Sequence, residues 1–132
     1  MKIQQRTKEG IAIVDLDGPL TAGEPAGAVR EALNGIQASG IQNAVLNLKG
    51  VDYIDSTGLG AMVVCFTSLR KAGGRLVLLN LNRRHIELLV LTKLSTVFEM
   101  FDDEQSAVNS FFPSREIKHF DILSFLEQQR ES

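Results

Sequence analysis

The chain of 132 residues fits a single domain and is long enough to bury a hydrophobic core. Its net charge of −2 provides no basic footprint, so direct binding of nucleic acid is not expected. A single cysteine excludes an internal disulfide framework, and no segment resembles a secretory signal or a membrane-spanning helix. We therefore expect a cytoplasmic protein without membrane insertion.

The first third of the chain predicts two strands followed by a helix. Residues 2–6 and 11–16 have strand composition and are joined by a turn at 8–10. Both faces of the second strand carry apolar side chains, which is typical of a strand inside a sheet. From Pro25 to about Ala38, apolar residues recur at helical spacing, and a glycine follows.

The middle of the chain predicts a central strand, a helix, another strand and a second helix. Residues 44–48 are almost continuously apolar, which favours a buried parallel strand. The next helix extends to about residue 71, and a strand follows at 75–80. Asn82 is a typical helix N-cap for a segment that reaches about Lys93.

Residues 96–101 predict a last short strand, with Val97 and Phe101 on one face and Phe98 and Met100 on the other. Asp102 and Asp103 then cap a helix that extends to about residue 112.

The alternation of strands and helices predicts an α/β fold: a mixed, mostly parallel sheet of about five strands with helices packed on it. The domain covers residues 1–112, and residues 113–132 form a C-terminal extension. In that extension Asp121 begins a short helix to about Gln129 that packs on the domain or on a second copy. Its apolar side chains belong to Phe120, Ile122, Leu123, Phe125 and Leu126.

Between the central strand and its helix lies a polar stretch, Asp55-Ser-Thr-Gly58, followed by Gly60. Aspartate, serine and threonine oxygens accept hydrogen bonds from the free N–H groups at a helix start. An ordinary helix cap would therefore be sufficient to explain this stretch. A nucleophile elbow does not fit, because Ile54 stands where that motif needs a glycine. A phosphate-binding loop does not fit either, because its glycine spacing and lysine are missing.

The longer motif Tyr53-Ile-Asp-Ser-Thr-Gly-Leu-Gly60 resembles the signature of STAS domains, and specifically of anti-sigma factor antagonists. The likeness extends from the N-terminus to about Phe112, and the order of elements agrees with it. The resemblance implies that Ser56 is the phosphorylation site, with Thr57 as the alternative. Asp55 matches the acidic residue beside the acceptor.

The resemblance also implies the partners. The unphosphorylated protein would bind an anti-sigma factor that has serine kinase activity, and a serine phosphatase would restore it after phosphorylation. The residues implied or inferred at the partner surface are Asp55, Ser56, Thr57, Gly58, Leu59, Gly60, Ala61 and Cys65. No cofactor, no metal and no catalytic residue is expected, since no base lies near Ser56 in the sequence.

Three questions stay open at this level. Gly58, Ala61 and Cys65 share one side of their helix, which fits either a partner-facing strip or a small, semi-buried cysteine. A STAS scaffold in a larger signalling assembly, or a STAS subunit of a lipid or anion transporter, is an alternative function. Self-association as a homodimer is the third. His85 and His119 do not form a catalytic or metal-binding set.

Overall fold

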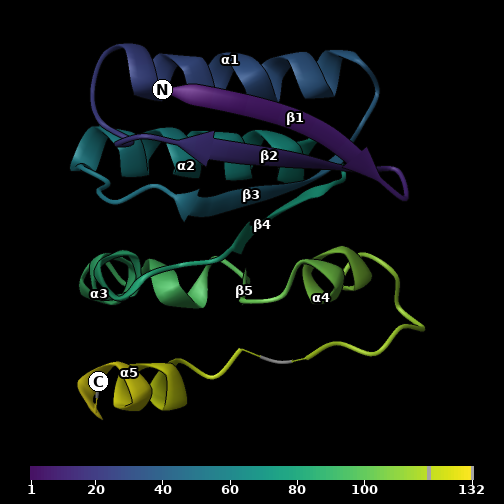
Figure 1. The fold of residues 1–132 in the computed structure, drawn as a ribbon. Helices are drawn as coiled ribbons and strands as arrows, with labels where there is room; N and C mark the ends of the chain where they lie inside the picture. Colours follow the sequence, from purple (N-terminus) through teal and green to yellow (C-terminus); the bar gives the residue numbers. More distant parts are fainter. Residues whose placement is uncertain (119, 132) are drawn as a thin grey trace.

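The computed structural model describes residues 1–118 and 120–131, with side chains described as far as Glu127. His119 therefore lies outside the described residues. A five-stranded sheet has the order β1-β2-β3-β4-β5 (Figure 1). The strands are β1 (Lys2–Lys8), β2 (Ile11–Asp17), β3 (Asn43–Gly50), β4 (Arg75–Leu79) and β5 (Met100–Phe101). β1 is antiparallel to β2, and the later neighbours are parallel, which confirms the predicted mixed sheet.

The helices cover both faces of this sheet. They are α1 (Glu24–Ala38), α2 (Ser56–Lys71), α3 (Arg83–Leu91), α4 (Glu104–Asn109) and α5 (Ile122–Glu131), with a 3-10 turn η1 (Leu94–Thr96). In β2, Val14 points to the larger core with α1, α2 and α3, whereas Ile13 points to the smaller core with α4. This alternation explains why both faces of the strand are apolar.

The predicted strand at 96–101 is largely wrong, because only Met100 and Phe101 pair with β4. Lys93 has a left-handed backbone with φ 63° and ends the preceding helix at Leu91, short of the predicted Lys93. The chain then turns through η1, where the N–H groups of Val97 and Phe98 both donate to the carbonyl of Leu94. These residues are therefore held in a turn and have no strand partner.

The predicted helix at 103–112 is also shorter than expected. Asp103 is its N-cap, and its side chain accepts a hydrogen bond from the N–H of Ser106 at 2.9 Å. The helix ends at Asn109, after which Phe111 and Phe112 lie in a turn and pack on the smaller core.

The segment after Phe112 returns to the domain at two places. Ile117 packs on the smaller core. Helix α5 lies beside α3 (Figure 1) and packs Ile122, Phe125 and Leu126 against the larger core. The side chain of Asp121 accepts hydrogen bonds from the first turn of α5, as the sequence predicts. The extension is thus a docked helix on the same chain.

None of the helices in the described part of the chain is long and apolar enough to cross a membrane.

Candidate functional site

The start of α2 is fixed by Asp55, which is the N-cap of that helix. Its Oδ1 accepts a hydrogen bond from the N–H of Gly58 at 2.7 Å, and its Oδ2 accepts one from the N–H of Ala22 at 3.0 Å. Both bonds favour the charged carboxylate and lower the pKa of Asp55, the Gly58 bond more strongly. One aspartate therefore caps α2 and ties it to the loop that follows β2.

The backbone of that loop, at Leu20, packs directly against the start of α2. The N–H of Leu20 donates to the carbonyl of Tyr53 at 2.9 Å, and the carbonyl of Leu20 accepts from the N–H of Asp55 at 3.2 Å. A Cβ on Gly58 would lie only 2.1 Å from the Leu20 carbonyl oxygen. Only glycine fits this close backbone approach, so the glycine after the hydroxyl residues has a direct structural cause.

Ser56 and Thr57 occupy the first turn of α2, and both are exposed. Asp55 rather than Ser56 supplies the cap, so the Ser56 hydroxyl is not needed to begin the helix. Free backbone N–H groups and the helix dipole make this position favourable for an anion. The site therefore combines an exposed hydroxyl with a rigid backbone and a field that tolerates added negative charge.

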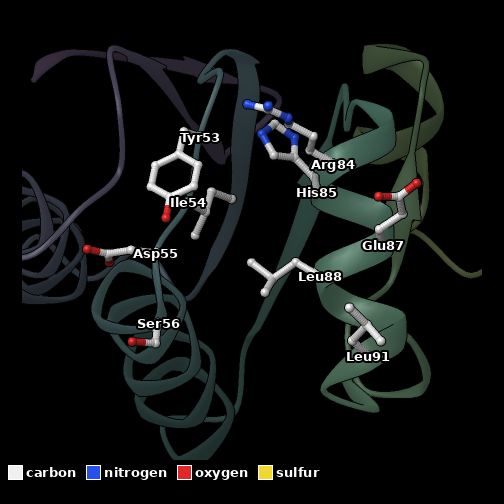
Figure 2. A pocket seen from close by; sticks show the side chains of 9 residues that line it. All are labelled: Tyr53, Ile54, Asp55, Ser56, Arg84, His85, Glu87, Leu88 and Leu91. Atoms are coloured by element: carbon white, nitrogen blue, oxygen red, sulfur yellow. The ribbon is translucent and has the colours of Figure 1, made fainter.

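A shallow depression of about 440 Å³ separates the start of α2 from α3 (Figure 2). Tyr53, Ile54, Asp55 and Ser56 form one side. The facing side of α3 contributes Arg84, His85, Glu87, Leu88 and Leu91. Ser56 thus lies at the edge of a partly apolar hollow formed by two helices.

His85 does not provide a base for Ser56. It is buried, and its Nδ1 accepts a hydrogen bond from the N–H of Asn82 at 3.1 Å. The Asn82 side chain in turn accepts from the N–H of His85 at 2.8 Å, which completes a capping box at the start of α3. Burial lowers the pKa of His85, and the Val51 carbonyl opposes this only in part.

In the described part of the chain, no group of three or more histidine, cysteine, aspartate or glutamate side chains is arranged to hold a metal ion.

Of the two interpretations left open for Gly58, Ala61 and Cys65, burial in the structure favours the core over a partner-facing strip. Gly58, Ala61 and Cys65 are all buried, and so is Leu59. Gly58 lies against the Leu20 backbone, and Cys65 packs in the larger core, where burial raises the pKa of its thiol to about 11. Small side chains do permit close approach here, but of the chain's own backbone and core. The exposed members of the predicted set are Ser56, Thr57 and Gly60, with Asp55 half-buried.

The sequence-based reasoning missed the contribution of α3. A signal was present, because residues 88–91 are four consecutive large apolar side chains. A helix buries one face, so a run of four cannot all be core. Leu89 is buried, whereas Leu91 is 82% exposed and lines the depression beside Ser56.

The fold and the site define a class of protein. It is an α/β domain with one antiparallel strand at the edge of a parallel sheet, and it presents the hydroxyl residues of one seated helix start to solvent.

The chain belongs to the STAS domain family, whose model matches residues 2–107. It is 41% identical over 61 residues to the anti-sigma-B factor antagonist of Bacillus subtilis (strain 168), a match that covers 46% of this chain and 56% of that protein. The anti-sigma F factor antagonist of Paenibacillus polymyxa is 27% identical over 109 residues, or 82% of this chain and 92% of that protein.

The solved structure of the Bacillus cell fate determinant SpoIIAA in its phosphorylated form has the same fold. The TM-score is 0.66 at 19% identity, over 83% of this chain and 99% of that one. At this identity the likeness shows the fold alone. The Bacillus subtilis relative is matched over little more than half of its length.

Proposed function

We propose that this chain is an anti-sigma factor antagonist that is switched by phosphorylation of Ser56. Unphosphorylated, it binds an anti-sigma factor with serine kinase activity and so releases a sigma factor. Phosphorylation ends that binding, and a serine phosphatase restores it. The names of the curated relatives favour this function over a scaffold or a transporter subunit. The proposal places the protein in the cytoplasm, where sigma factors act.

The observation that carries the proposal is the position of Ser56. It is exposed at the first residue of α2, while the capping role belongs to Asp55. A kinase needs the acceptor hydroxyl in line with the γ-phosphate of ATP, and a fixed backbone reduces the entropic cost of that alignment. We assign ATP, metal and the base that takes the hydroxyl proton to the partner, because His85 is buried and its Nδ1 is engaged at the start of α3.

The switch acts on the interface and leaves the fold intact. Phosphoserine carries about −1.5 to −2 charges near neutral pH, and the N–H groups at the start of α2 tolerate that charge. A partner that closes over Ser56 would have to bury the dianion or oppose it with acidic groups. A penalty of about 3 kcal/mol weakens binding by roughly 100-fold, which is enough to release a partner.

The assignment of Ser56 is tested by phosphorylation with the cognate kinase and ATP, followed by peptide mapping. We expect phosphate on Ser56, none after Ser56→Ala, and normal labelling of the matched Thr57→Ala control. Phosphate on Thr57, or continued labelling of Ser56→Ala, contradicts the assignment. Recovery of the chain with an ATPase subunit of a transporter, with no phosphate at Ser56 in cells, favours the transporter alternative.

A further inference from the structure

The α3–α5 surface carries large apolar side chains that face solvent. Leu91 at the end of α3 is 82% exposed, and Leu123 in α5 is 73% exposed. Helix α5 docks through Ile122, Phe125 and Leu126, which pack on the larger core, and Leu126 keeps part of its surface exposed. Folding of the chain therefore explains the buried face of α5 and leaves the exposed leucines unexplained.

Two neighbouring depressions share residues on this surface. The hollow beside Ser56 is lined by Glu87 and Leu91 from α3 (Figure 2). The same two residues line a second, mainly apolar depression of about 330 Å³, which is completed by Ile86, Val90 and Leu126. The surface is therefore continuous from Ser56, across Leu91, to the C-terminal helix.

This continuity connects the α3–α5 surface with the site at which the kinase is proposed to bind. A protein that closes over Ser56 to phosphorylate it also meets Leu91, because both residues line one shallow hollow. The charged side chains that line the hollow are Asp55, Arg84 and Glu87, and Arg83 pairs with Glu87 at 2.9 Å. Acidic and basic groups are therefore balanced, so the surface does not select a strongly charged segment. An apolar segment of the partner is the chemistry that removes Leu91 from water.

We propose that Val90, Leu91 and Leu126, which line one depression, form a second docking surface for an apolar segment of the same anti-sigma factor kinase. Leu123 lies at its margin, because it precedes Leu126 by three positions and so shares that side of α5. This inference rests on the proposed function. It assigns to α5, which lies beyond the family match at 2–107, a role in choosing the partner. Ser56 reports the phosphorylation state, while the α3–α5 surface contributes affinity and selectivity.

The test uses the kinase that wild-type chain, but not Ser56→Asp, captures from the lysate of its own organism. That kinase is purified and titrated by calorimetry against Leu91→Asp and Leu123→Asp. Val97→Asp is the matched control, because Val97 is 43% exposed and lines a different depression near the C-terminal end of α2. The α2 residues of that depression, Phe66 and Arg70, lie about 15–21 Å from Ser56 along the helix axis.

We expect Leu91→Asp to weaken binding by about 30-fold and Leu123→Asp by about 5-fold, with Val97→Asp within about 2-fold of wild type. Melting temperatures should change little at these exposed positions, and Leu91→Ser replaces Leu91→Asp if the latter melts early. Equal affinity of all three variants overturns the inference. Loss of self-association with unchanged kinase affinity also overturns it, since the surface would then bind a second copy.

The same titrations separate this inference from the function on which it rests. If Ser56→Asp binds the kinase weakly and Leu91→Asp binds it normally, only the proposal of a second docking surface is contradicted. The proposed function itself is contradicted if the wild-type chain captures no kinase, or captures only one that Ser56→Asp captures equally well.

Discussion

Substitution of Gly58 by alanine tests how the phosphorylation site is built. The new Cβ would lie 2.1 Å from the Leu20 carbonyl oxygen, and real Cβ contacts essentially never fall below 3.0 Å. The loop and the helix start must therefore separate by about 0.9 Å, which disturbs the 3.2 Å hydrogen bond from Asp55 N–H to Leu20. Overpacking destabilises the fold by about 1–3 kcal/mol, and the weakened hydrogen bond adds about 1 kcal/mol. The higher helix propensity of alanine stabilises the fold by about 1 kcal/mol.

The net destabilisation is about 2 kcal/mol, which lowers the melting temperature of a domain of this size by about 8 °C. Gly60 supplies the matched control, because a Cβ there meets no atom within 4 Å. Gly60→Ala should raise the melting temperature by about 2–4 °C through helix propensity alone. Thermal melting followed by circular dichroism measures both variants. If Gly58→Ala is as stable as Gly60→Ala, the seating of α2 on the Leu20 loop is wrong.

Three further predictions concern stability. Burial lowers the pKa of His85 below its usual 6.5, so the histidine of the unfolded chain is protonated first, and stability should fall as the pH drops below about 6.5. Melting temperatures measured from pH 8 to pH 5 should fall more steeply for wild type than for His85→Gln. Parallel curves would contradict this prediction. The pKa of Asp55 is depressed below 3.8, so its contribution to stability is fully present above that pH and is lost as the pH falls through the folded pKa. Urea unfolding should show wild type losing its advantage over Asp55→Asn as the pH falls below 3.8, and an advantage that does not decrease in acid would refute the role of the carboxylate. Truncation after Pro113 removes the packing of Ile117 and α5 and should lower the melting temperature by about 5 °C while Ser56 is still phosphorylated; a truncated chain that does not fold would place the extension in the core.

Local patterns were sufficient to predict most of the sheet. The apolar run of β3 and the double-faced β2 follow from residue periodicity, and both lie inside the sheet. The N-caps Asn82 and Asp103 follow from side-chain chemistry. Each of these features depends on residues that are neighbours in the sequence, so it can be predicted before the fold is known.

Features that depend on distant contacts were not predictable in this way. Residues 96–101 have strand composition, but hydrogen bonds to the Leu94 carbonyl hold Val97 and Phe98 in a turn, and only Met100 and Phe101 pair with β4. The strip at Gly58 and Cys65 was equally compatible with a partner or with the core. Gly58 is explained by the Leu20 loop, which is 38 positions away and contacts it only in the folded chain, whereas Cys65 packs in the larger core.

The central claim is that phosphate on Ser56 strongly weakens binding to the kinase without unfolding the domain. It is tested most directly by calorimetric titration of the purified kinase with the unphosphorylated chain and with the same chain after stoichiometric phosphorylation. The account predicts an affinity about 100-fold lower for the phosphorylated chain, with a melting temperature within a few degrees of the unphosphorylated one. Equal affinities, or a phosphorylated domain that has unfolded, would contradict it.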